Sequence, residues 1–145
     1  MDDHGNPALA AVLARLPGAA AFRLGDGPAL SADLTARVLA GRKTATSGAL
    51  RDDEADGEPL PRVGRRDVLC HWDWTPAAVV ETVEVTLQQF RDVPAAFAEA
   101  EGEGGLAAWR AGHMAFLARN GGWSEDMVLV CERFRVVERL GGDGG

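Results

Sequence analysis

The sequence of 145 residues lacks most of the residues that metal sites and disulfide frameworks need. It has two cysteines, Cys70 and Cys131, without a C-x-x-C pair, and its histidines, His4, His71 and His113, are far apart. A zinc site is therefore not expected, and we predict neither a metal nor a cofactor. Each cysteine lies in an apolar, strand-like run, which is typical of a buried free thiol in a reducing compartment.

Long apolar runs and an excess of positive charge are also missing. The start of the chain is faintly similar to a signal peptide, but it is acidic and Arg15 interrupts its apolar stretch. With 15 Lys plus Arg against 22 Asp plus Glu, the formal net charge is -7. Binding along a duplex needs a broad basic surface, whereas a small basic pocket needs only a few charges. We therefore expect a cytoplasmic protein whose partner is a small-molecule nucleoside or an RNA end, not an extended duplex or a membrane; the oligomeric state stays open.

The length and composition of the chain fit one domain with its own core. The sequence is 46% hydrophobic and 26% charged, as in ordinary globular proteins. We expect residues 1–20 to form an N-terminal extension with one helix from Pro7 to about Leu16, and residues 21–140 to form the domain. Residues 1–6 and a disordered tail at 141–145 are polar or glycine-rich, so both are expected to be loose.

Helical and strand patterns are mixed along the chain without a regular β-α-β alternation. One helix is expected from an N-cap at Ser31 to a stop at Gly41, and another from Asp92 to Gly102. A third has an apolar stripe at helical spacing, formed by Leu106, Trp109, His113, Phe116 and Leu117. Strands are expected at residues 44–50, 67–74, 77–90 and 127–138, with an acidic loop at 51–66. The predicted class is α+β, a small curved sheet or barrel with helices at its flank and end.

Three titratable residues fall on faces that the patterns predict to be buried. Glu81 and Glu132 lie among valines, so each needs a partner, and an arginine partner within the core is favoured over a catalytic role. His113 is interpreted as a half-buried structural histidine. Cys70 as a nucleophile is disfavoured, because its neighbour His71 points to the opposite face of a strand.

Lysine is the scarcest charged residue: Lys43 is the only one, and the other fourteen positive residues are arginine. It lies just after the expected helix end at Gly41, in the segment "GRKTATS". This segment differs from a phosphate-binding P-loop, because Arg42 separates the glycine from the lysine, and nucleoside triphosphate hydrolysis is therefore excluded. A solvated helix C-terminus explains the positive charges but not the choice of lysine.

Lysine differs from arginine in that it can lose its proton. Burial, or an adjacent cation such as Arg42, favours the neutral amine, which can act as a general base. Thr46 supplies a hydroxyl from which such a base takes a proton, and a further acidic group would then protonate the leaving group.

The segment "VLAGRKTAT" resembles the signature of ASCH-domain proteins, a branch of the PUA-like β-barrel superfamily. The segments "PLPRVGRRDVL", "VVETVEV", "FAEAEGEGGLAAWRAGHMAF" and "EDMVLVCERFRVVE" are also similar to the family, so that the resemblance covers roughly residues 22 to 138. It implies a small PUA-like β-barrel with flanking helices, a fold that often contacts RNA or modified bases.

One ASCH branch that is similar to this stretch hydrolyses the acetyl amide of N4-acetylcytidine. The resemblance implies that Lys43 is the proton acceptor, Thr46 the nucleophile and Glu101 the proton donor, and that Arg42, Thr44 and Ser47 bind the substrate. The chain departs from the short form of that branch by its additional N-terminal helix and the insertion "RDDEADGEPLP".

Another ASCH branch is reported to cut RNA, so two functions stay open. The first is a small hydrolase acting on an acylated nucleoside or a related amide. The second is an RNA- or nucleotide-binding module, or a ribonuclease, that uses the same pocket. In this module Arg42, Lys43 and Arg51 contact phosphate, and Trp109 or another aromatic residue stacks on a base.

The hydrolase hypothesis has two geometric requirements. Residues three apart on a straight strand face opposite ways, so the chain must bend just after Gly41 for Lys43 and Thr46 to meet. An ionised Glu101 would hold the proton on Lys43, so Glu101 has to be protonated. Both requirements imply a desolvated pocket.

Overall fold

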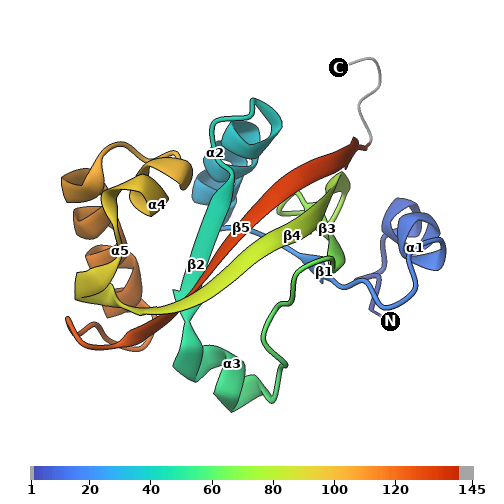
Figure 1. Cartoon of the computed structure of the whole chain (residues 1–145). Coiled ribbons are helices and arrows are strands. Elements are labelled where there is room, and N and C mark those ends of the chain that lie inside the picture. Colours follow the sequence, from blue (N-terminus) through green and yellow to red (C-terminus); the bar gives the residue numbers. More distant parts are fainter. Residues whose placement is uncertain (1, 141–145) are drawn as a thin grey trace.

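A computed structural model of the chain describes residues 2–140 (Figure 1). In chain order, the elements are α1 (Pro7–Ala14), β1 (Ala21–Phe22), α2 (Pro28–Leu39), β2 (Ala45–Ala49), α3 (Leu50–Asp56), β3 (Arg66–Cys70), β4 (Pro76–Gln89), the 3-10 turn η1 (Phe90–Asp92), α4 (Ala95–Ala100), α5 (Leu106–Arg119) and β5 (Val128–Arg139). No helix of the described chain is long and apolar enough to cross a membrane.

The strands form one mixed sheet of five strands in the order β1-β3-β4-β5-β2. β1 pairs with β3 in parallel, and the other pairs are antiparallel. The long strands β4 and β5 form the middle of the sheet, and β2 is an outer strand that pairs with β5. The predicted α+β class is confirmed.

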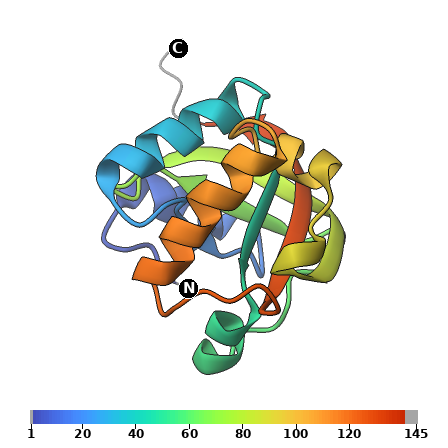
Figure 2. The same cartoon turned by 90° about the vertical axis from the view of Figure 1, so that its left-hand side faces the viewer.

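The helices cover different parts of this sheet and bury three apolar clusters. α1 lies at one end, where Leu9 and Leu13 pack with Val68 and Val79, while α4 and α5 lie at the other (Figure 1). There, the side chains in contact are Phe97, Trp109, Leu117, Ala45 and Leu129. α2 packs on the sheet between these two ends. Seen from the side, α2 and α5 both lie on the face of the sheet that is turned towards the viewer (Figure 2). Lys43, just before β2, is buried, whereas Arg42 and Thr44 on either side of it are exposed.

Several helix boundaries differ from the prediction. α2 begins at Pro28 after Gly27, because proline is well suited to the first helical position, and Ser31 is a buried residue inside the helix instead of its N-cap. Part of the predicted acidic loop is helix α3, which has Asp52 and Asp53 in its first turn, where acidic side chains are favourable.

The beginning of the chain is more ordered than predicted. The side chain of Asn6 accepts a hydrogen bond from the Leu9 amide and caps α1, and the ring of His4 stacks on Trp74 with the centroids 3.5 Å apart. The expectation of loose residues is therefore wrong for the end of this segment. The predicted tail at 141–145 lies outside the described residues.

The partners of the two glutamates differ from each other. Glu81 pairs with Arg66 at 3.0 Å and Arg135 at 3.3 Å, which confirms arginine partners, although both arginines are exposed. Glu132 instead accepts a hydrogen bond from the Thr82 hydroxyl at 2.8 Å, and the expected arginine partner is wrong for it. Irregular register of β4 around residues 82–84 interrupts the strict alternation on which the prediction depended.

Both cysteines are free and buried, as predicted. Burial raises the pKa of the Cys70 thiol to about 11 and that of Cys131 to about 12. Neither thiol is therefore a nucleophile near neutral pH.

The loop between α4 and α5 lies against the connection between α2 and β2. Gly102 has φ +77°, and a Cβ atom there would lie 2.6 Å from the carbonyl oxygen of Arg42. We expect Gly102→Ala to lower the free energy of unfolding by about 1–3 kcal/mol, because it combines a strained backbone with a steric overlap.

Gly112 in α5 is the matched control, since a Cβ atom there meets nothing within 4 Å. Gly112→Ala should be neutral or stabilise the protein by up to about 1 kcal/mol. Urea unfolding of the two variants measures both effects, and equal stabilities would contradict the proposed close approach at Gly102.

Candidate functional site

A pocket of about 340 Å³ lies between α2, β2 and α5. This volume is at the lower end of the range of small-molecule sites, about 300–1,000 Å³. Its polar lining includes Lys43, Thr46, Ser47, Glu101 and His113, and its apolar lining includes Leu30, Leu34 and Phe116. Lys43, the expected base, and Glu101, the expected acid, therefore line the same cavity.

A larger hollow of about 730 Å³ lies beside the end of α1. Four arginines line it, and three of them are paired with carboxylates. No buried acid or base of the described chain lines this hollow, so we place the candidate site in the smaller pocket.

The chain bends just after α2, as the hydrolase hypothesis required. Gly41 has φ +80°, and the amides of Arg42 and Lys43 both donate to the Arg37 carbonyl at 2.9 and 3.1 Å. The Thr44 amide then donates to the Ala100 carbonyl at 2.7 Å, which ties this turn to the end of α4. The Lys43 side chain is thereby directed inward, and it is only 2% exposed.

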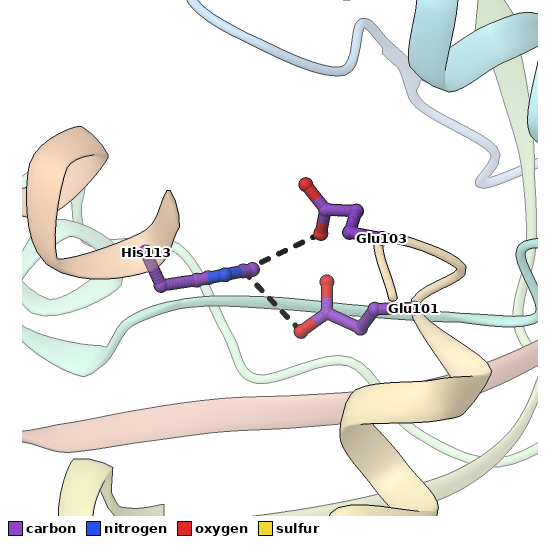
Figure 3. Close-up of side chains that lie close together, drawn as sticks. All are labelled: Glu101, Glu103 and His113. Carbon is purple, nitrogen blue, oxygen red and sulfur yellow. Dashed lines mark ion pairs between the residues drawn. The ribbon is translucent and has the colours of Figure 1, made fainter. Parts of the chain in front are cut away.

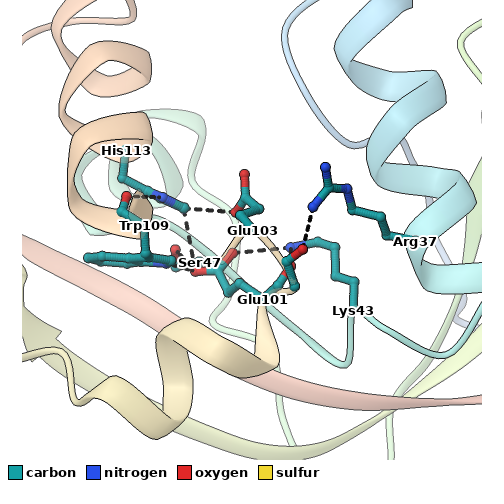
Figure 4. A network of polar contacts seen from close by, with 8 residues as sticks. Arg37, Lys43, Ser47, Glu101, Glu103, Trp109 and His113 are labelled. Atoms are coloured by element: carbon teal, nitrogen blue, oxygen red, sulfur yellow. Dashed lines mark hydrogen bonds and ion pairs between the residues drawn. The ribbon is translucent and has the colours of Figure 1, made fainter. Parts of the chain in front are cut away.

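Glu101 caps the C-terminus of α4 and receives polar contacts from several elements (Figure 4). Lys43 Nζ lies 3.1 Å from its Oε1 and 3.3 Å from its backbone oxygen. The Ser47 hydroxyl and the Trp109 indole N–H each donate to its Oε2 at 2.7 Å. His113 Nε2 lies 3.4 Å from the same oxygen. Among the described residues, Lys43 and Glu101 are the only charged side chains that are buried.

These contacts determine the ionisation of Glu101. Burial by itself would raise the pKa of the carboxyl group, but the hydrogen bond with His113 and the charge of Lys43 outweigh it and lower the pKa to about 2. These surroundings favour an ionised Glu101 in the free protein, whereas the hydrolase hypothesis requires a protonated Glu101 when it donates its proton.

The structure brings together some of the predicted site residues and not others. Lys43 and Glu101 form an ion pair, and Thr46 lines the same pocket. The hydroxyl that contacts Glu101 belongs to Ser47, whereas Thr46 is paired across the sheet with Glu132. Arg42 and Thr44, predicted to bind substrate, are exposed and do not line the pocket.

Two residues of α5 were assigned other roles from the sequence. Trp109 was a candidate for stacking on a base, but it is 0% exposed and its ring packs on Phe90 and His113, so that role is wrong. His113 is half-buried as predicted, yet it contacts Glu101 as well. The i, i+4 spacing of the two residues indicates a shared helix face, but nothing in the sequence places that face against residue 101.

Glu101, Glu103 and His113 also present ligand-type atoms within 4.8 Å of one another (Figure 3). Carboxylate and imidazole groups suit several divalent metals. However, Glu101 Oε2 already accepts hydrogen bonds from Ser47 and Trp109, and the Lys43 ammonium group opposes a second cation nearby. These groups therefore fit a hydrogen-bonded cluster better than a metal site.

The lowered pKa of Glu101 predicts a specific loss of stability in acid. A carboxylate with a folded-state pKa below its unfolded value stabilises the protein above the unfolded value, and this contribution is lost as the pH falls towards the folded value. The fall from 4.5 to about 2 corresponds to about 3 kcal/mol, at about 1.4 kcal/mol per pH unit.

Urea unfolding between pH 5 and pH 2 measures this contribution. We expect the native protein to lose about 3 kcal/mol more over this range than Glu101→Gln. The control is Glu125→Gln, since Glu125 is an exposed carboxylate, and this variant should keep the native slope. Parallel curves for the native protein and Glu101→Gln would show that Glu101 is not held ionised.

Comparison with known proteins agrees with the fold. Residues 20–138 match the family model for the ASCH domain. A crystal structure of an ASCH domain from Lactobacillus crispatus JV V101 is 29% identical with a TM-score of 0.79, over 89% of this chain and 86% of that one. Protein EF3133 from Enterococcus faecalis V583 is 28% identical with a TM-score of 0.79, over 90% and 85% respectively. No curated protein matches the chain. The chain belongs to the ASCH domain family.

Proposed function

We propose that this ASCH domain is a small hydrolase that acts on an acylated nucleoside or a related amide, similar to N4-acetylcytidine. The observation that carries the proposal is the buried pair of Lys43 and Glu101 at the pocket. A buried ion pair contributes little net stability, because desolvation offsets the attraction between the charges. Buried titratable pairs in clefts are therefore candidates for catalysis.

The ion pair supplies a base and an acid by one internal proton transfer. Lys43 Nζ lies 3.1 Å from Glu101 Oε1, and if its proton moves to this oxygen, the pair becomes a neutral amine and a carboxylic acid without a change in total charge. A bound ligand that excludes water favours this neutral pair, because desolvation penalises the charged forms. The ionised Glu101 of the free protein is thus compatible with its role as a proton donor.

The proposed reaction then uses both groups. Lys43 takes the proton from the Thr46 hydroxyl while the oxygen of Thr46 attacks the carbonyl carbon of the amide. Glu101 then protonates the leaving nitrogen as the C–N bond breaks. As water attacks the resulting ester, Glu101 takes a proton from the water and Lys43 returns its proton to the threonine oxygen, so that the threonine is restored. The carboxylic acid formed passes its proton to Lys43 and leaves as a carboxylate, and Glu101 retains the one proton released in the turnover. Ser47 holds Glu101 in place through its hydrogen bond of 2.7 Å.

The lining of the pocket favours a nucleoside over a nucleotide. Among the described residues, its basic groups besides Lys43 are Arg119 and His113. Arg119 is paired with Asp26 at 2.7 Å, and His113 faces the carboxylates of Glu101 and Glu103. A phosphate group would therefore find no free positive charge in the pocket. Leu30, Leu34 and Phe116 offer an apolar wall for a base.

Lys43→Arg tests the need for an amine that can lose its proton. Arginine keeps the positive charge, so nucleoside binding should remain while the deacetylation rate of N4-acetylcytidine falls by about a hundredfold or more. The rate is measured by chromatography of the released cytidine, binding by calorimetry, and folding by thermal unfolding. The control is the reverse change at the exposed neighbour, Arg42→Lys, which should keep native activity. If the native protein forms no product but binds RNA or nucleotides, it is a binding module instead.

Two further variants identify the nucleophile. Thr46→Val removes the proposed attacking hydroxyl with little change in shape, and we expect a loss of turnover of about a hundredfold or more. Ser47→Ala removes one of the donors to Glu101, so its loss should be smaller. Mass spectrometry of the protein after rapid mixing with substrate locates a trapped acetyl group. An acetyl group on Ser47 with full activity in Thr46→Val would reverse the two roles.

A further inference from the structure

Hydrolysis of an amide in this pocket leaves a proton that must reach solvent. Near neutral pH, an amide and water give a carboxylate and a neutral nucleobase amine, so each turnover releases one proton. The group that collects this proton in the proposed reaction is Glu101, which is 1% exposed. A buried carboxylic acid needs a path by which its proton reaches solvent.

His113 lies beside Glu101 with both ring nitrogens facing oxygen atoms. Nδ1 is 3.0 Å from the carbonyl oxygen of Trp109, which can only accept a hydrogen bond, so Nδ1 carries a hydrogen. Nε2 is 3.4 Å from Glu101 Oε2 and 3.9 Å from Glu103 Oε2. An unprotonated Nε2 would therefore face carboxylate lone pairs, and a proton between the imidazole and a carboxylate removes this repulsion.

The three side chains follow a gradient of exposure from the buried acid to the surface. The exposed fractions of the side chains are 2% for Glu101, 14% for His113 and 27% for Glu103. His113 Nε2 is within 4 Å of both carboxylates, so this single atom can exchange a proton with either (Figure 3).

We propose that His113 and Glu103 form a proton route that connects Glu101 with solvent. The inference rests on the hydrolase function proposed above. After a turnover, the proton on Glu101 passes to His113 Nε2, then to Glu103 or to water, and Glu101 returns to its ionised form beside Lys43. His113 is thus a positioning residue that acts through Glu101 and makes no bond to the substrate.

The charges around His113 are consistent with an exchangeable proton on this ring. Burial by itself lowers the pKa of His113, but the hydrogen bond and charge of Glu101 and the charge of Glu103 raise it above 6.5. Lys43 lies beyond Glu101, and Asp52 of α3 and Arg119 at the end of α5 line the same pocket. Because the two carboxylates are the nearest charges, the state of the ring should report on both.

The first test needs no substrate. Nuclear magnetic resonance titration of the ring signals should give His113 a pKa above 6.5, and Glu101→Gln and Glu103→Gln should each lower it. If the pKa of His113 is not above 6.5, or if neither variant changes it, the route is overturned even where turnover is observed.

The second test is chemical rescue. His113→Ala should lower kcat by about tenfold to a hundredfold, and added imidazole should restore part of it in proportion to its concentration. Glu103→Gln should lower kcat less, and His71→Ala should leave it unchanged. A folded His113→Ala variant that keeps full kcat, or that loses kcat without rescue by imidazole, overturns the route. If the native protein has no turnover at all, the proposed function fails, and the titration alone decides whether the shared proton exists.

Discussion

The buried ion pair between Lys43 and Glu101 is the contact to which the local structure on both sides is adapted. Lys43 reaches Glu101 because Gly41 ends α2 in a left-handed turn and the Thr44 amide is bonded to the end of α4. Glu101 is held by groups from β2 and α5, and Gly102 allows the following loop to approach the Arg42 backbone. Two helix ends, one strand and one loop therefore meet at the carboxylate of Glu101. The groups around this carboxylate outweigh the effect of its burial and lower its pKa.

How much of this was predictable differs between the fold and the site. Helical periodicity predicted α5, and the glycine stop predicted the end of α2, because both depend on neighbours in the sequence. The start of α2 was misplaced because two N-terminal signals compete there, and Pro28 takes the first helical position in preference to a cap at Ser31. The partner of Glu132 was wrong because irregular register in β4 changes which side chains face each other.

The site was predictable only in part. The scarcity of lysine singled out Lys43, and the resemblance to ASCH-domain proteins paired it with Glu101, which is its ion-pair partner in the structure. The contacts of Trp109 and His113 with Glu101 were not predictable, because they depend on how α5 packs against the end of α4. The preference of Glu101 for its ionised form was not predictable for the same reason, since it depends on these donors.

The position of Lys43 also limits how this protein can be modified after synthesis. It is the only lysine of the chain, and its side chain is enclosed. Acetyl, methyl or ubiquitin groups attached through a lysine side chain therefore have a single possible acceptor, and its modification would displace the ion pair from the pocket. Any modification of Lys43 in the folded protein would therefore also disrupt the candidate site.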